Sequence, residues 1–152
     1  MAPNESTKSD ESQNEAQIRA IIEGWADAIR AKDSNGIAAN LAPDLLLFDL
    51  INPLQYRGSQ SVSARAEEWL SSFKGPVAYE VRDLTITAGD NVAFCHSLNH
   101  VDGTRADGQK IEMWWRATVC FRKFDGKWTV VHEHSSVPFD MTDGKASFNI
   151  KP

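Results

Sequence analysis

The stretch from Lys110 to Pro138 limits the possible folds of this chain more than any other part of it. Two runs in which apolar and polar residues alternate flank Asp125-Gly126, a pair that favours the tight turn of a β-hairpin. Such alternation is typical of strands whose two faces meet different environments. The stretch therefore predicts two long strands joined by one turn.

Helical periodicity dominates the part of the chain before this hairpin. The apolar positions at helical spacing are Ile18, Ile21, Ile22, Trp25 and Ile29. They predict one amphipathic helix, which begins near a capping box formed by Ser12 and Glu15 and ends at about Lys32. Two shorter helices are expected over about residues 35–41 and 61–73.

The strands follow the helices, apart from one short apolar strand over residues 45–50 between the second and third helices. Alternation over 77–86 and 92–101 predicts two strands before the hairpin, with a loop over 102–108. Helices segregated from a four-strand antiparallel meander indicate an α+β fold. We expect a cone-shaped α+β barrel, in which three N-terminal helices pack into a curved, mostly antiparallel sheet.

Length and composition indicate one domain over residues 13–140, with a disordered polar tail over 1–12 and a C-terminal tail over 141–152. A net charge of -5 argues against a nucleic-acid partner, which would require clustered basic residues. No apolar run is long enough to cross a membrane, and the polar N-terminus lacks a signal pattern, so a cytoplasmic location is expected. No glycine motif for phosphate binding and no CxxC pair occurs, and we expect no cofactor.

A series of short motifs is similar to a known superfamily and extends over about residues 14–138. These motifs are Trp25…Asp33, Gly36-Ile37, Ala42-Pro43-Asp44…Phe48-Asp49, Gly58, Gly89-Asp90-x-x-Ala93, Arg116-x-Thr118 and Asp125-Gly126-Lys127-Trp128-x-x-x-His132-x-His134-x-Ser136-x-Pro138. With them the chain resembles the nuclear transport factor 2-like superfamily, and more narrowly its SnoaL-like and ketosteroid-isomerase-related members. The last block also resembles the association domain of calcium/calmodulin-dependent kinase II.

The resemblance implies a conical pocket for a small hydrophobic molecule and cofactor-independent acid–base chemistry of the isomerase, cyclase or dehydratase type. The superfamily also contains proteins without catalysis. A ligand-binding or oligomerisation module is therefore the alternative function. A homodimer is expected in either case, because the sheet face that does not cover the helices carries exposed aromatic and apolar residues.

Asp49 is the first candidate for catalysis. It interrupts an apolar strand, where an ionised carboxylate is unfavourable unless it is paired or lies in a polar cavity. A desolvated carboxylate has a raised pKa and can act as a general base. The resemblance places the catalytic base of ketosteroid isomerase at Asp49, its tyrosine at Trp25 and its protonated aspartate at or next to Val119. The alternative is that Asp49 ends the strand and caps the loop.

His96 is the second candidate. Strand alternation puts it on the same face as Phe94 and Leu98. The resemblance implies that this position points into the cavity, where a neutral imidazole could donate a hydrogen bond or a proton to a substrate carbonyl. The alternative is a hydrogen-bonded histidine in a polar core.

The hairpin divides into two faces. One set comprises Trp115, Ala117, Val119, Phe121, Val131, Glu133 and Ser135, and the other Trp114, Arg116, Thr118, Cys120, Trp128, Val130, His132 and His134. The resemblance assigns the first set to the cavity and the second to the dimer-facing side. Glu133 would then be a second carboxylate in the cavity, and such pairs push their pKa values apart. One β-bulge would invert part of this assignment.

The remaining site predictions concern substrate binding and metals. Trp25 and Trp69 lie on apolar helix faces and belong to the core or to a cavity wall. With Trp115, Val119, Glu133 and Ser135 they complete the predicted substrate-binding set. The pair His132 and His134 has a spacing that can bind a metal, with His100 or Glu112 as possible third ligands, but a polar ladder at the dimer surface is the preferred interpretation, and we expect no metal.

Overall fold

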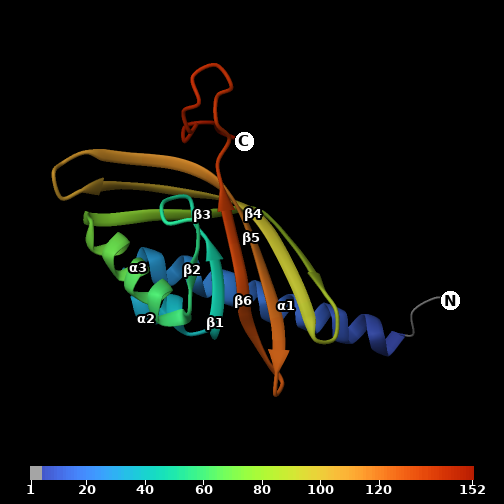
Figure 1. Cartoon of the computed structure of the whole chain (residues 1–152). Helices are drawn as coiled ribbons and strands as arrows, with labels where there is room; N and C mark the ends of the chain where they lie inside the picture. Colours follow the sequence, from blue (N-terminus) through green and yellow to red (C-terminus); the bar gives the residue numbers. More distant parts are fainter. Residues whose placement is uncertain (1–4) are drawn as a thin grey trace.

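The computed structural model describes residues 5–152, with side chains from residue 8 onward, and confirms the α+β prediction (Figure 1). The elements are α1 (Glu5–Arg30), α2 (Ser34–Ala38), β1 (Leu41–Phe48), β2 (Tyr56–Arg57), α3 (Ser59–Ser71), β3 (Phe73–Ala88), β4 (Val92–Arg105), β5 (Lys110–Phe124) and β6 (Lys127–Ser136). The predicted helices and strands all occur. Only the two-residue strand β2 was not expected, since it is too short to show alternation.

The sheet has the strand order β2-β1-β6-β5-β4-β3. Strands β3 to β6 form the predicted antiparallel meander, and β1 joins it by pairing parallel with β6. The sheet is strongly curved, and α1 lies across its inner face (Figure 1). Strand β4 is longer than expected, because it continues to Arg105, whereas β5 begins at Lys110 as predicted.

Helix α1 begins earlier than the capping box predicted. It includes residues 5–12, so the prediction of a disordered tail is wrong for these residues, while residues 1–4 lie outside the described part of the chain. The buried Asn14 anchors the helix next to this extension, because its amide donates to the Gly89 carbonyl at 3.2 Å and its Oδ1 accepts from Lys123 Nζ at 2.8 Å. These bonds hold the first half of the helix against the sheet.

The core consists of two apolar clusters on the inner face of the sheet. The larger one is centred on Ile18, Leu45 and Phe121, and the smaller one contains Phe73 and Val101. Each buried aliphatic or aromatic side chain contributes roughly 1.5–3 kcal/mol relative to an exposed one, so these clusters dominate the stability of the fold. The candidate site lies where residues of both clusters meet.

A β-bulge in β6 corrects part of the predicted division of the hairpin into faces. Cys120 pairs with His132, but the next residue of β5, Phe121, pairs with Val130, which leaves Val131 as the extra residue. Trp128 and Val130 were predicted on the outer face and are instead buried on the inner face. Beyond the bulge the predicted alternation is correct, because Glu133 pairs with Val119 and lies on the inner side.

The predicted C-terminal tail is attached to strand β5. Phe139 and Ala146 form an isolated β-bridge, the Trp114 amide donates to the Phe148 carbonyl at 3.0 Å, and Lys151 forms an ion pair of 3.2 Å with Glu112. Residues 139–152, which we call the C-terminal arm, project past the end of β6 (Figure 1). Among the residues described, no helix is both long and apolar enough to cross a membrane.

Candidate functional site

A cavity of about 90 Å³ lies between the helices and the inner face of the sheet. Its lining residues are Ile22, Trp25, Ile29, Ile37, Leu41, Val62, Tyr79, Val81, Ser97, Asn99, Ala117, Val119 and Glu133. Most of this wall is aliphatic, and the polar groups come from neighbouring strands of the sheet. An apolar cavity with a few convergent polar groups is typical of a small-molecule site.

Glu133 is the one carboxylate in this wall. It pairs with Val119 of β5 on one side and with Leu47 of β1 on the other, so two buried aliphatic residues flank it. Burial raises the pKa of Glu133 from 4.5 to about 7, and the nearby charge of Asp49 adds to the rise. Among the described residues, no cation or hydrogen bond lowers this pKa. Glu133 therefore exchanges a proton near neutral pH, as a general acid or base requires.

A hydrogen-bonded group of three polar residues faces the same cavity. Ser97 Oγ donates to Asn99 Oδ1 at 2.8 Å, and the Asn99 side chain is also hydrogen-bonded to the Tyr79 hydroxyl. Burial, and then the charge of Glu133, raise the pKa of Tyr79 above its ordinary range, so the phenol keeps its proton. The group is rigid because its members satisfy one another.

Asp49, the predicted base, lies just beyond β1 and is absent from the cavity wall. Its Oδ1 accepts from the Leu50 amide at 2.7 Å, and its Oδ2 is 3.5 Å from Arg65 Nε of α3. About a fifth of each of the two paired side chains is exposed, 21% for Asp49 and 20% for Arg65. Asp49 thus caps the loop, as the alternative interpretation expected. Its negative charge influences the cavity by raising the pKa of Glu133.

The prediction that His96 points into the cavity is wrong. His96 is exposed and pairs with Thr118 on the outer face of the sheet. Its neighbours Cys95 and Ser97 occupy the inner face, since successive strand residues point to opposite sides. The shared face with Phe94 was predicted correctly, but Phe94 is 45% exposed, so that face is the outer one. His96 therefore cannot contact a ligand in the cavity.

The predicted substrate-binding residues separate into two groups. Trp25, Val119 and Glu133 line the cavity, whereas Trp69, Trp115 and Ser135 are absent from its wall. Trp69 packs edge-on against Phe73 with ring centroids 5.4 Å apart. The ring centroid of Trp115 lies 5.8 Å from that of the cavity residue Tyr79. Ser135 is buried and is the strand partner of Ala117.

Sequence reasoning missed Tyr79, Ser97 and Asn99. The signal was present in the alternation of β4, where Ala93, Cys95, Ser97, Asn99 and Val101 form one face. The opposite face, with Phe94, His96 and Leu98, was assigned to the cavity because the resemblance implies that the position of His96 points inward.

The two histidines of β6 lie on the outer side of the sheet. His132 Nδ1 is 2.8 Å from the Leu46 carbonyl, and Phe48 packs edge-on against His132 and His134 at centroid distances of 4.9 and 5.4 Å. Within residues 8–152, no group of three or more His, Cys, Asp or Glu side chains has the arrangement of a metal site.

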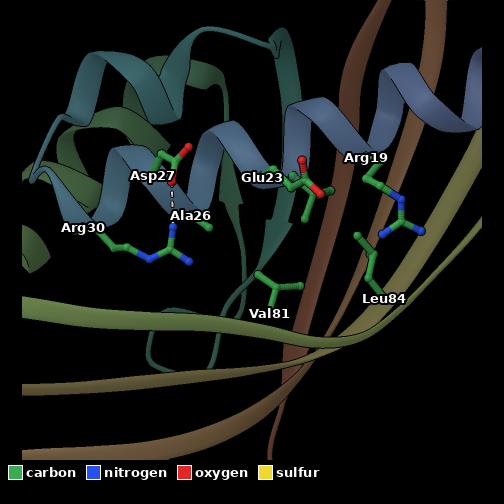
Figure 2. Close-up of a pocket in the computed structure, with 8 residues that line it drawn as sticks. Arg19, Glu23, Ala26, Asp27, Arg30, Val81 and Leu84 are labelled. Atoms are coloured by element: carbon green, nitrogen blue, oxygen red, sulfur yellow. Dashed lines mark hydrogen bonds and ion pairs between the residues drawn. The ribbon is translucent and has the colours of Figure 1, made fainter.

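A second hollow, of about 320 Å³, is open to solvent between α1 and β3 (Figure 2). Figure 2 shows Arg19, Glu23, Asp27 and Arg30 along the helix above Val81 and Leu84 of the strand. Arg30 forms an ion pair of 2.7 Å with Asp27 and donates to the Tyr79 carbonyl at 3.0 Å. These charged side chains are exposed, and Arg30 and Asp27 neutralise each other. The hollow therefore has no desolvated ionisable group comparable to Glu133 in the inner cavity.

Comparison with known proteins agrees with this architecture. The model of the SnoaL-like domain family matches residues 18–140. A nuclear transport factor 2-like protein of unknown function from Pseudomonas putida KT2440 has 38% identity and a TM-score of 0.84, with 93% of this chain and 98% of that chain covered. No protein with curated annotation matches the sequence.

Two more distant structures share the fold alone. A superfamily member from Salmonella enterica serovar Typhimurium has 18% identity and a TM-score of 0.75, covering 90% of this chain and 99% of that one. A candidate dehydratase of the nuclear transport factor 2-like family from Streptomyces avermitilis has 12% identity and a TM-score of 0.72, covering 83% of this chain and 97% of that one. The predicted resemblance to the SnoaL-like family and to the nuclear transport factor 2-like superfamily is confirmed.

Proposed function

Because the chain belongs to the SnoaL-like family, within the nuclear transport factor 2-like superfamily, we propose that it binds a small apolar molecule in the cavity and moves a proton on it. The observation that carries the proposal is Glu133, a carboxyl group in an apolar wall with a pKa of about 7. Within the described part of the chain, no cation or hydrogen bond lowers this pKa. The candidate dehydratase with the same fold is compatible with this class of chemistry.

In this proposal Glu133 is the proton-transferring group, and Asp49 is a positioning residue. A general base must lie within hydrogen-bond reach of the proton that it removes, and Glu133 is the carboxylate that lines the cavity. Asp49 lies outside the cavity wall, paired with Arg65, and its charge adds to the rise in the pKa of Glu133 that burial causes. No cofactor takes part.

The size of the cavity limits the substrate. An engineered cavity of about 150 Å³ in another protein binds benzene, whereas the cavity here measures about 90 Å³. The site as it stands therefore accepts molecules no larger than a single small ring. A larger substrate would have to displace side chains of the wall.

Deuterium exchange tests the proposed chemistry directly. Cyclopentanone and nitroethane are small carbon acids, and exchange of their acidic C–H protons in D₂O is followed by NMR. We expect wild-type protein to accelerate the exchange and Glu133→Gln to lose at least about 100-fold of the acceleration, the low end for general base catalysis. The matched control is Glu112→Gln, since Glu112 is a strand carboxylate bonded to Lys151 and His100 outside the cavity.

Two results would contradict proton transfer by Glu133. One is full exchange activity in Glu133→Gln, and the other is loss of activity in Asp49→Asn without any change in the pH dependence. If wild-type protein binds the probes without exchange, the alternative function, a ligand-binding module without catalysis, is supported instead.

We also propose that a second copy of the chain covers the outer face of the sheet. Large apolar side chains are exposed at both ends of this face: Val92, Phe94 and Phe124 at one end, and Phe139, Met141, Phe148 and Ile150 of the C-terminal arm at the other. The arm joins β5 at Trp114, on the order of 30 Å along the strand from Phe124. If a two-fold axis passes through the middle of the outer face, the C-terminal arm of each copy covers Val92, Phe94 and Phe124 of the other copy.

Light scattering after size exclusion tests this arrangement. We expect a dimer that becomes monomeric in the double variant Phe94→Asp/Phe124→Asp. The control is Leu54→Asp, because Leu54 is 93% exposed in the loop after β1, away from this face. A wild-type monomer, or a dimer that survives the double substitution, would contradict the proposal.

A further inference from the structure

Two residues belong to the walls of both hollow spaces beside α1. Ile22 of α1 and Val81 of β3 line the inner cavity of about 90 Å³, and they also line the open hollow of about 320 Å³ between α1 and β3. We call this hollow the outer hollow and the two shared residues the partition. Because each partition residue contacts both spaces, one layer of side chains separates the inner cavity from the outer hollow at this point.

Strand β3 is the less constrained side of the partition. It is the last strand in the sheet order and pairs with β4 along one edge. This pairing is irregular between Arg82 and Thr85, directly after Val81, and Asp83 has a positive φ of 55° there. An edge strand with an interrupted ladder opens at a lower free-energy cost than a central strand. Residues 81–84 are therefore the part of the wall that can move aside for a ligand.

One side-chain contact fastens β3 to α1 next to the partition. Arg30 donates to the Tyr79 carbonyl at 3.0 Å, and its guanidinium also pairs with Asp27 at 2.7 Å. From Val81 to Ala88, no hydrogen bond or ion pair joins β3 to α1 in the described chain. The strand is thus tied to the helix at one end of the outer hollow and can separate from it at the other.

The outer hollow combines an aliphatic floor with a charged rim. Its apolar residues are Ile22, Ala26, Val81 and Leu84, and its rim carries two arginines and two carboxylates, so the formal charge of the rim is zero. Figure 2 shows Arg19 extending from α1 toward Leu84, with Glu23 farther along the helix. Within residues 8–152, Arg19 and Glu23 form no ion pair, whereas Arg30 and Asp27 pair with each other.

This rim favours an uncharged polar group. Arg19 supplies hydrogen-bond donors and Glu23 supplies acceptors, so a hydroxyl group can accept from the first and donate to the second. A carboxylate on the ligand would be repelled by Glu23, and an ammonium group would be repelled by Arg19.

We propose that the inner cavity and the outer hollow hold one ligand, an elongated and uncharged amphipathic molecule. A small ring passes the partition into the inner cavity, an alkyl chain lies on Leu84, and a terminal hydroxyl group reaches the rim. Together the two spaces reach the usual size of small-molecule sites, roughly 300–1,000 Å³, which the inner cavity alone does not. This inference rests on the proposed function for the chemistry of the ring beside Glu133, but not for the binding of the chain.

The test locates three probes on the wild-type protein. They are cyclopentanone, a cyclopentanone with a hydroxypentyl chain next to the carbonyl, and the matching ketone whose chain ends in a carboxylate. Intermolecular NOEs are measured to the methyl groups of Val119, which line the inner cavity alone, and of Leu84, which line the outer hollow alone. Both methyl groups are assigned through their backbone connectivities in the wild-type protein.

We expect the ring of the hydroxypentyl ketone to give NOEs to Val119 and its chain to give NOEs to Leu84. Cyclopentanone should give NOEs to Val119 without Leu84, and the carboxylate should bind more weakly than the hydroxypentyl ketone. NOEs from the hydroxypentyl ketone to only one of the two residues, or tighter binding of the carboxylate, would overturn the inference.

Affinities of two variants provide a second measurement. Leu84→Ala removes apolar surface from the outer hollow, so the hydroxypentyl ketone should bind about tenfold more weakly, while cyclopentanone should bind as it does to wild type. The matched control is Ile86→Ala, because Ile86 packs against the same core cluster of β3 but lines neither space. Equal losses in the two variants would contradict a chain that lies on Leu84.

The two proposals fail separately. If the hydroxypentyl ketone spans Val119 and Leu84 but no C–H proton exchanges, the joined site stands and the catalytic role of Glu133 falls. If exchange of cyclopentanone depends on Glu133 but the hydroxypentyl ketone does not contact both residues, the catalytic role stands and the joined site falls.

Discussion

Strand β6 presents two kinds of ionisable side chain to two different environments. His132 and His134 lie on the outer face, where the Leu46 carbonyl and the Phe48 ring contact them. Glu133, between them in sequence, lies in the apolar cavity, where nothing offsets its desolvation. The histidines are the conspicuous residues, but their contacts explain them structurally. The desolvated carboxyl group of Glu133 indicates where proton transfer can occur, whereas the spacing of His132 and His134 does not.

The largest expected effect is a difference in stability loss between substitutions on the inner face of the sheet and substitutions on its outer face. Phe121 is fully buried on the inner face, whereas Phe94 is 45% exposed on the outer face of the neighbouring strand. We expect Phe121→Ala to lower the free energy of unfolding by about 3–5 kcal/mol. The same substitution at Phe94 should cost less than about 1 kcal/mol in the monomer. Denaturant unfolding measures both, and equal losses would contradict the assignment of faces.

The second effect concerns the stability penalty of ionised Glu133. Because its folded-state pKa is raised from 4.5 to about 7, the native state loses stability as pH rises through this window. Above pH 7 the accumulated penalty is about 3 kcal/mol, and Glu133→Gln should recover much of it, with little gain below pH 4.5. Unfolding measured at pH 4.5 and pH 8 checks this.

Glu112 offers a control of opposite sign for this experiment. Hydrogen bonds from Lys151 and His100 lower the pKa of Glu112, so its charge is favourable above the unfolded-state pKa and the benefit is lost on acidification. Glu112→Gln should therefore not stabilise the protein at pH 8. A stabilisation equal to that of Glu133→Gln would show a general effect of net charge instead of the burial of Glu133.

The third effect isolates the charge of Asp49. Asp49→Asn removes a negative charge next to Glu133, so the pKa of Glu133 should fall below 7 while burial keeps it above 4.5. The midpoint of the pH–rate profile should move in the same direction. Carbon-13 titration of the glutamate carboxyl groups measures the shift. An unchanged Glu133 midpoint would show that the two carboxylates do not interact.

The smallest effect compares the two outer histidines. His132→Gln should lose about 1 kcal/mol of stability, because Nδ1 lies 2.8 Å from the Leu46 carbonyl and joins β6 to β1. His134→Gln should lose less, because His134 is exposed. Thermal unfolding of both variants provides the comparison. A larger loss for His134 would contradict the contacts described for the outer face.

The sequence alone predicted the order and type of the main elements, because alternation and helical spacing depend on local burial. It also placed Glu133 on the inner face. It could not locate the bulge at Val131, which reverses the faces of Trp128 and Val130, since an extra strand residue leaves no local signature there. The orientation of β4 was equally hidden, because its outer residue Phe94 is larger than the inner residue Ser97.

The candidate site was therefore predicted only in part. Trp25, Val119 and Glu133 were assigned to the cavity correctly, whereas the partnership of Tyr79 with Asn99 joins two strands and depends on their register. The pKa of a buried carboxyl group depends on its three-dimensional surroundings and is likewise invisible to residue spacing.

One titration tests the central claim most directly. The carbon-13 signal of the Glu133 carboxyl group, assigned by its absence in Glu133→Gln, should titrate with a midpoint of about 7 in the wild-type protein without ligand. A midpoint near 4.5 would mean that Glu133 is solvated or paired and cannot be the proton-transferring group.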